Sequence, residues 1–261
     1  MYFLDITLKN FQIFLIVLLR ISGIFVLSPV FGAASLPQRV KVFASVFFSF
    51  VILPQVVATS FEIPMDFLGY AIILFRELLV GVIIGFAAMV IMNIIQFAGK
   101  MVDMGMGLHM ASVVDPMNRD QASVIGQLFY FIAILIFLLT NSHYYLISAV
   151  VKSFEVIPIN GLVIDGRIID LLLNLFTRIF SIGFQIAMPI AGILFILTFT
   201  LGIMSKTVPQ LNVFFVGIPL QIIIGLILLM FSFTLFYPVF LNLIMSMKDD
   251  LFAVVKALGN P

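Results

Sequence analysis

Cysteine and tryptophan are absent from this sequence of 261 residues, and only 10% of its residues are charged. Without cysteine the chain has no disulfides and no thiol chemistry. A soluble domain carries about 25% charged residues, and so few charges cannot cover a surface that faces water. The net charge of +1 provides no basic field for nucleic acid, so we expect no nucleic-acid partner. These shortages exclude an ordinary soluble globular domain.

The residue patterns of common catalytic sites are missing as well. The sequence contains no GxxxxGK[ST] phosphate loop, no HExxH motif and no GxSxG elbow. The two histidines, His109 and His143, cannot make a metal site by themselves. We therefore expect no catalytic residues, no cofactor and no metal. A copper site that uses Met106, His109 and Met110 is left open as an alternative.

The residues that are present are mostly apolar: 63% are hydrophobic, and the mean hydropathy is +1.29. About six apolar regions have a length suited to a bilayer, and short polar breaks separate them. We interpret 248–261 as a polar tail. The sequence therefore predicts one all-α membrane domain over 1–261. The apolar regions cover roughly 11–31, 42–61, 67–98, 122–151, 168–204 and 211–247.

The last two apolar regions are too long for single crossings. As one straight helix, 211–247 would rise about 55 Å at about 1.5 Å per residue, against a hydrocarbon core of about 30 Å. Pro189, Pro219 and Pro238 offer places for a break. We expect these regions to be bent into helical hairpins or to protrude beyond the bilayer. Lys and Arg divide evenly between the two sides of a six-crossing arrangement, which leaves the topology open.

Four charged residues, Arg20, Arg76, Glu77 and Arg178, lie inside apolar regions. A charge in lipid is costly, so each needs protein, water or a partner around it. Arg76 and Glu77 are neighbours that diverge by about 100° on a helix, so they do not pair simply with each other. We expect the four at segment ends or at contacts with other subunits. A proton or ion path is the alternative, although no series of acidic residues accompanies them.

Small residues recur at four-residue spacing in two regions. Gly81 and Gly85 form a GxxxG pair, and Gly183, Ala187 and Ala191 continue the same spacing. Faces of this kind let helix backbones approach closely in lipid. They predict helix packing, within the chain or against a partner.

The segment 99–121 is rich in methionine and glycine. Methionine fills irregular apolar gaps, and glycine lets the backbone bend sharply. Asp115 and Pro116 would end any helix that precedes them. A soft plug is one interpretation of the segment, and an ordinary connecting loop is the other.

Four segments, in order along the chain, resemble one family. The first, LLRISGIFVLSPVFGAASLPQRVKV (18–42), has an apolar helix with Arg, then Pro, then Pro followed by basic residues. GLHMASVVDP (107–116) and LLTNSHYYLISAVVKSFEVIPI (138–159) follow. The last, SKTVPQLNVFFVGIPLQIIIGL (205–226), carries the pattern basic-x-x-Pro-Gln-x-x-x-Phe-x-x-Gly-x-Pro, with Lys206 where Arg is common. Together they resemble the FliR family of the flagellar and type III secretion export gate, and 138–159 favours its flagellar branch.

The resemblance implies a structural and gating subunit, not an enzyme, in the bacterial inner (cytoplasmic) membrane at the flagellar basal body. The implied partners are FliP-type and FliQ-type subunits around a pore, the neighbours FlhB and FlhA, membrane lipid, and the unfolded flagellar proteins that pass through. A self-contained small-solute transporter or channel is the alternative class.

The resemblance also strengthens the plug interpretation and places the plug in the methionine-rich segment. The residues expected to form it are Met104, Gly105, Met106, Gly107, Leu108, His109, Met110, Asp115, Pro116 and Met117. Contacts between helices or subunits are expected at Arg20, Arg76, Glu77, Gly81, Gly85, Arg178, Pro209, Gln210 and Pro219.

Overall fold

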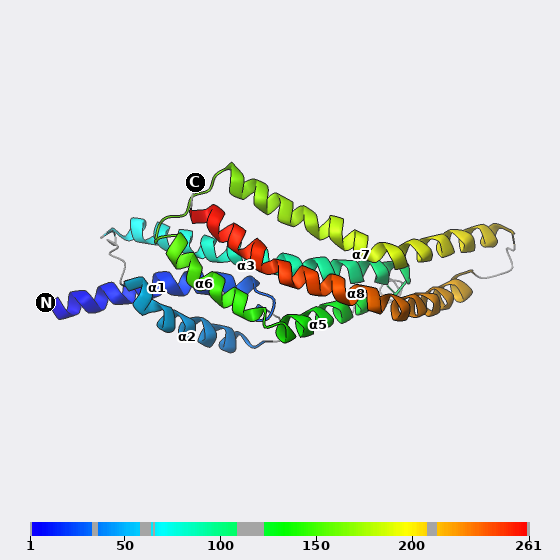
Figure 1. Cartoon of the computed structure of the whole chain (residues 1–261), viewed down its shortest axis with the longest axis horizontal. Helices are drawn as coiled ribbons and strands as arrows, with labels where there is room; N and C mark the ends of the chain where they lie inside the picture. Colours follow the sequence, from blue (N-terminus) through cyan, green and yellow to red (C-terminus); the bar gives the residue numbers. More distant parts are fainter. Residues whose placement is uncertain are drawn as a thin grey trace. The chain divides into compact units, whose positions relative to one another are not determined.

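The computed structural model describes residues 2–32, 36–57, 64, 66–108, 123–207 and 213–259. The secondary structure of these residues consists of helices joined by turns and short connections, without strands (Figure 1). Five of the helices are long and apolar enough to cross a membrane, and α5 and α6 together count as a sixth candidate. The prediction of an all-α membrane protein is confirmed. The helices are α1 (Tyr2–Leu27), α2 (Gln38–Val57), α3 (Phe67–Gly105), α5 (Val124–Leu139), α6 (His143–Val156), α7 (Gly166–Thr207) and α8 (Val213–Gly259).

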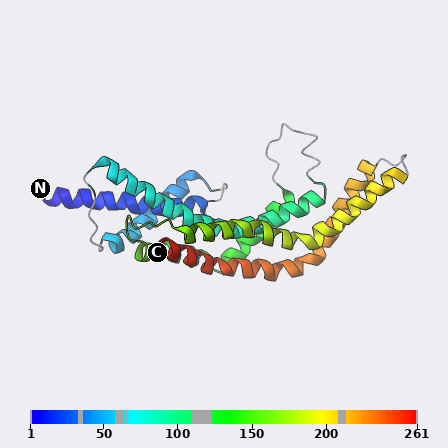
Figure 2. The same ribbon diagram turned by 90° about the horizontal axis from the view of Figure 1, so that it is seen from above.

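The two longest apolar regions form one helix each. α7 has 42 residues and contains Pro189, and α8 has 47 residues and contains Pro219 and Pro238. Long apolar helices tolerate proline where neighbouring helices and local adjustments satisfy the freed backbone groups. Figure 2 shows the end of α7 and the start of α8 side by side. The expected hairpin is therefore made by α7 and α8 together, and not by a bend inside either region.

The apolar region 122–151 is divided between two helices. α5 ends at Leu139 and α6 begins at His143. Between them Asn141 has a φ of 55°, a left-handed conformation that asparagine tolerates better than most residues. The hydroxyl of Thr140 donates to the carbonyl oxygen of Ile136 at 2.8 Å and so occupies an acceptor at the end of α5. Hydropathy alone predicted one uninterrupted region here.

The tail is not a polar break, because α8 continues to Gly259. Leu251, Val254, Val255 and Leu258 are at most 1% exposed, and their spacing places them on one face of the helix. The charged residues that precede them lower the mean hydropathy of 248–261. Hydropathy alone therefore does not reveal this apolar face. The prediction of a polar tail over 248–261 is wrong for the residues that the structure describes.

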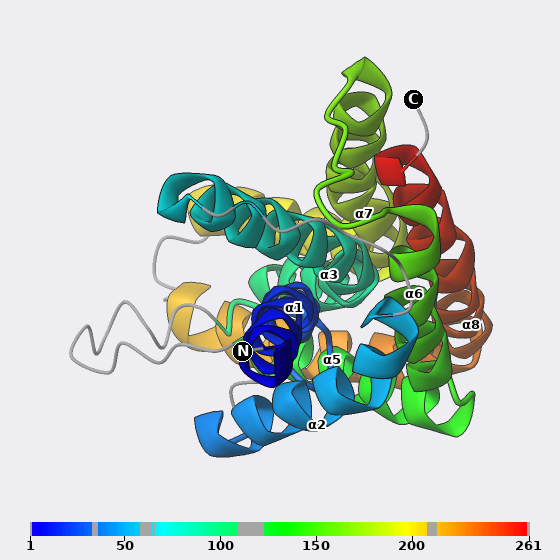
Figure 3. The ribbon, with the colours of Figure 1, turned by 90° about the vertical axis from the view of Figure 1, so that its left-hand side faces the viewer.

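Contacts divide the chain into two compact units, to which α3, α7 and α8 all contribute. The first unit contains Met1–Val90, Asn141–Leu175 and Ser246–Pro261, and the second contains Ile91–Thr140 and Phe176–Met245. In the first unit α1 lies between α2 and α3 (Figure 3). The prediction of one domain over 1–261 stays a prediction.

α7 begins at an aspartate cap in the first unit. The carboxylate of Asp165 accepts hydrogen bonds from the backbone N–H of Ile168 at 3.1 Å and from the side chain of Arg167 at 2.8 Å. The hydrogen bond from Arg167 and the one from Ile168 lower the pKa of Asp165, so the cap is charged at neutral pH.

Candidate functional site

The described part of the expected plug, Met104–Leu108, is the end of α3 and the turn after it. α3 ends at Gly105, and Gly107 adopts a left-handed φ of 73°. The backbone N–H of Gly107 donates to the carbonyl oxygen of Met104 at 3.1 Å. Glycine adopts this conformation without a clash at Cβ, which makes it a common helix terminator. The helix thus ends before Asp115 and Pro116. The other expected plug residues, His109, Met110, Asp115, Pro116 and Met117, lie outside the described residues.

The turn is anchored on α8 and α7. Met106 is fully buried, and a Cβ at Gly225 of α8 would lie 2.6 Å from its Cγ and 2.7 Å from its Cε. A Cβ at Gly105 would lie 3.2 Å from Cδ1 of Leu194 in α7. The side chain of Met104, by contrast, is 57% exposed. The end of α3 therefore presents one methionine outward and buries the other.

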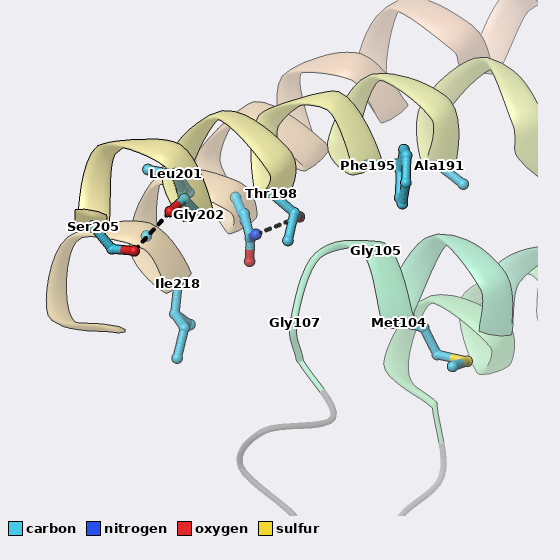
Figure 4. Close-up of a pocket in the computed structure, with 12 residues that line it drawn as sticks. Met104, Gly105, Gly107, Ala191, Phe195, Thr198, Leu201, Gly202, Ser205 and Ile218 are labelled. Carbon is cyan, nitrogen blue, oxygen red and sulfur yellow. Dashed lines mark hydrogen bonds between the residues drawn. The ribbon is translucent and has the colours of Figure 1, made fainter. Parts of the chain in front are cut away.

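A cavity of about 580 Å³ lies between the end of α3 and the paired ends of α7 and α8 (Figure 4). Its wall is mostly apolar and includes Gly105, Gly107 and Phe195. Its polar side chains are Ser205 and a hydrogen-bonded pair: Nε2 of Gln221 donates to Oγ1 of Thr198 at 2.7 Å. The sequence signal for this pair is a single polar residue inside each of two long apolar regions, and sequence analysis alone predicted no role for either residue.

We expect Gln221→Leu to lower the free energy of unfolding by about 0.6 kcal/mol, the average for a hydrogen bond between membrane helices. Thr198→Val should have a similar effect, because it removes the acceptor of the same bond. Thermal unfolding in detergent measures both. The double variant Gln221→Leu/Thr198→Val should lose no more than one single variant, and additive losses would show that the bond is not the cause.

The start of α5 is tied to α3 close to this turn. The carboxylate of Asp103 accepts a hydrogen bond from the backbone N–H of Ile125 at 3.2 Å. Ser123 caps α5, because its hydroxyl accepts from the backbone N–H of Gly126 at 2.9 Å. A Cβ at Gly99 would lie 2.7 Å from Cα of Gly126, so the two backbones are in close contact. The end of α3, before 109–122, and the start of α5, after it, thus both pack within the second unit.

Two of the four charges inside apolar regions form a buried ion pair in the first unit. Nη2 of Arg20 in α1 lies 2.5 Å from Oε2 of Glu77 in α3, and Nε donates to the same oxygen at 2.6 Å. Neither side chain is exposed. The ring of Phe154 lies 4.2 Å from the guanidinium carbon and covers it. The two charges therefore neutralise each other where α1 packs on α3, and a contact of these residues with another subunit stays a prediction.

The same pair holds the end of α6. Nη1 of Arg20 donates to the carbonyl oxygens of Ser153 and Ile157 at 2.9 and 3.1 Å. The carbonyl oxygen of Ser153 also accepts from the backbone N–H of Ile157 at 2.9 Å, at the C-terminal end of α6. Oε1 of Glu77 accepts from the backbone N–H of Asn160 at 3.0 Å. The guanidinium of Arg20 and the carboxylate of Glu77 therefore join α1 and α3 to the end of α6 and the chain that follows it. We call Arg20, Glu77 and the three backbone groups that they contact, at Ser153, Ile157 and Asn160, the Arg20–Glu77 cluster.

The remaining charged and proline positions are more exposed. Nη1 of Arg76 donates to Oδ1 of Asn160 at 2.8 Å, so Arg76 and Glu77 both contact Asn160. Arg178 is half-buried on α7, and Pro219 is exposed on α8. Pro209 and Gln210 lie outside the described residues.

The small residues lie where helices of this chain approach each other. A Cβ at Gly81 would overlap the carbonyl oxygen of Arg20, and one at Gly85 would lie 2.8 Å from the carbonyl oxygen of Ile24. In the second unit, a Cβ at Gly183 of α7 would lie 3.1 Å from the carbonyl oxygen of Ile94 in α3. Glycine is what allows the α1–α3 and α3–α7 contacts.

Within the described residues, no group of three or more His, Cys, Asp or Glu side chains could hold a metal ion. Arg20 and Glu77 are ionisable residues that the fold brings together, and neither side chain is exposed to solvent. The candidate site therefore consists of packing contacts between helices and of a turn beside a cavity.

Residues 11–247 match the family described as "Bacterial export proteins, family 1". The chain belongs to this family. It is 34% identical to the flagellar biosynthetic protein FliR of Bacillus subtilis (strain 168) over 235 residues, which cover 89% of this chain and 90% of that protein. It is 30% identical to FliR of Aquifex aeolicus (strain VF5) over 253 residues, 90% of this chain and 96% of that protein. Identity to FliR of Escherichia coli (strain K12) is 29% over 212 residues, 81% of this chain and 80% of that protein.

The resemblance to the FliR family is confirmed by this membership. The chain is a multi-pass membrane protein of a protein-export family, and its relatives are named for flagellar biosynthesis. The family is described by export and not by a reaction.

Proposed function

We propose that the chain is a structural and gating subunit of the flagellar type III protein export gate. It assembles with FliP-type and FliQ-type subunits around a pore for unfolded flagellar proteins, in the bacterial inner membrane at the flagellar basal body, with FlhB and FlhA as neighbours. Family membership and the names of the relatives support this proposal.

The length of exposed apolar helix carries the proposal that this is one subunit of a larger assembly. Large apolar side chains are exposed along α8 from Phe215 to Met245, a rise of about 45 Å, and along α7 from Phe176 to Ile203, about 40 Å. The hydrocarbon core is about 30 Å thick. α8 alone would need a tilt of about 48° to stay within it, beyond the usual range of about 0–40°. Partner proteins covering the excess apolar surface remove this conflict.

Within that assembly the end of α3 is the proposed gate. The gate residues that the structure describes are Met104, Gly105, Met106, Gly107 and Leu108; His109, Met110, Asp115, Pro116 and Met117 complete the proposal outside the described residues. Met104 is the exposed residue among the first three, and its flexible thioether suits an irregular seal against a neighbour.

Co-expression tests the assembly. With FliP-type and FliQ-type subunits the tagged chain should purify as a stable particle that contains all three, and without them it should aggregate, because its apolar surface is uncovered. Size-exclusion chromatography with mass measurement distinguishes the two. A monodisperse chain that moves a small solute in liposomes by itself would instead support the self-contained transporter.

Deletion of 105–110 tests the gate. We expect the particle to form in normal amount while the membrane becomes permeable to small ions, because the deletion removes only the last residue of α3 and leaves α7 and α8, whose exposed apolar faces the partners cover, unchanged. Membrane depolarisation in cells that carry the complex measures the leak, and co-purification of the partner subunits is the control. A tight membrane with a complete particle would refute the gate assignment.

A further inference from the structure

We infer that Met106 and Gly225 form a positioning contact that holds the gate residues Met104–Leu108 in their closed place. This inference rests on the proposed function. It adds a residue of α8, outside the methionine-rich segment, to the parts that set the position of the gate.

Met106 and Gly225 fit closely together, with the side chain provided by Met106 alone. Met106 is 0% exposed, and the space it fills exists only because residue 225 has no side chain. A Cβ there would lie 2.6 Å from Cγ and 3.1 Å from Sδ of Met106, distances at which the methionine has to move. Gly225 lies within α8, where alanine forms helix more readily, so the glycine costs helix stability and gains this contact.

A second residue of α8 lies beside the turn, on the same face of the helix. Gln221 precedes Gly225 by one helical turn, so the two residues share a face. Oε1 of Gln221 lies 3.1 Å from the position that a Cβ of Gly107 would occupy, and Gly107 holds the left-handed φ of 73°. The turn thus lies along α8 with Met106 at Gly225 and Gly107 at Gln221.

The cavity lies beside the same turn and includes Gly105, Gly107 and Gln221 in its wall. The turn is therefore not fully packed on the side that borders the cavity. Its buried side chain is that of Met106. Gly105 keeps a separate contact with Leu194 of α7, at 3.2 Å from its Cβ position. Loss of the Met106 contact should shift the turn while α3 stays packed on α7.

The experiment compares four single variants of the full chain, assembled with its partner subunits in cells. Gly225→Ala displaces Met106, and Met106→Ala removes the side chain that fills the space. Met106→Leu conserves apolar volume, and Gly192→Ala is the matched control, since its Cβ would meet no described atom of this chain within 4 Å. Ion leak is measured by depolarisation and divided by the amount of assembled complex recovered.

We expect Gly225→Ala and Met106→Ala to raise the leak per complex at least about fivefold, the effect of a shift of about 1 kcal/mol in a two-state equilibrium. Met106→Leu and Gly192→Ala should leave it unchanged. The double variant Met106→Ala/Gly225→Ala should leak no more than the worse single variant, because both act through one contact.

Several outcomes would overturn the inference. If the first two variants stay tight while deletion of 105–110 leaks, the gate stands and the positioning contact does not. A leak that appears only with loss of the complex would show that Met106 stabilises the fold and positions nothing. Leaks that add in the double variant would show two independent defects. A tight deletion variant refutes the proposed gate itself, and the inference with it.

Discussion

Arg20→Ala should lower the free energy of unfolding by about 3–5 kcal/mol, the usual cost of removing one member of a buried ion pair. The variant leaves the carboxylate of Glu77 without its counter-charge at a site with no solvent exposure. It also removes the donor to the carbonyl oxygens of Ser153 and Ile157. Because a folded domain is stable by only about 5–15 kcal/mol, we expect little folded protein.

Thermal unfolding of the detergent-solubilised complex measures this loss, with yield as a second readout. Arg20→Lys should fall between wild type and alanine, since one ammonium cannot reach Glu77 and two carbonyls in the same fixed geometry. Arg20→Met/Glu77→Leu should be less harmful than either single apolar substitution, because it leaves no unpaired charge. Arg167→Ala is the control: it breaks the exposed pair with Asp165 and should change nothing measurable. An Arg20→Ala variant as stable as wild type would contradict the structural role of the cluster.

Gly81→Ala and Gly192→Ala should have opposite effects. At Gly81 the new Cβ overlaps the carbonyl oxygen of Arg20 and lies 3.1 Å from Cα of Gly23, so α1 and α3 have to separate. Overpacking of this kind costs about 1–3 kcal/mol, and here it also moves Arg20, so we expect the upper end of that range. At Gly192 the Cβ meets nothing within 4 Å, and alanine should stabilise α7 by up to about 1 kcal/mol.

The comparison uses unfolding of the same assembled complex for both variants. Gly81→Leu extends the series and should abolish folding, whereas Gly202→Ala, which also meets no atom, should resemble Gly192→Ala. Equal small effects at Gly81 and Gly192 would show that α1 and α3 tolerate a wider separation than the structure has.

The Arg20–Glu77 cluster could be predicted from the sequence only in part. Each charge inside an apolar region could be recognised as costly, since insertion energies are summed residue by residue. Its partner could not be recognised, because residues 20 and 77 come together only when α1 and α3 pack. Arg76 is the neighbour of Glu77 in the sequence, yet it lies at the exposed side and donates to Asn160.

Helix boundaries show a similar division. The apolar regions overlap α1, α2 and α3, because mean hydropathy responds to composition, but α1 begins at Tyr2 rather than near residue 11 and α3 continues to Gly105 rather than ending near residue 98. Mean hydropathy joined α5 and α6 across Asn141 and cut α8 short at Lys248, because averaging ignores both a single left-handed residue and the spacing of apolar residues within a charged stretch. The end of α3 likewise depends on Gly105 and Gly107 rather than on the later proline.

What the sequence determined by itself is the class and the family: scarce charge and long apolar regions require an all-α membrane protein, and ordered motifs identify a bacterial export protein. Both are sums of local properties along the chain. Only the tertiary structure decided that Arg20 meets Glu77, that Gly81 admits the backbone of α1, and that Gly225 accommodates Met106. Those contacts depend on separations of a few ångströms between residues far apart in the chain, and such separations exist only once the helices have packed.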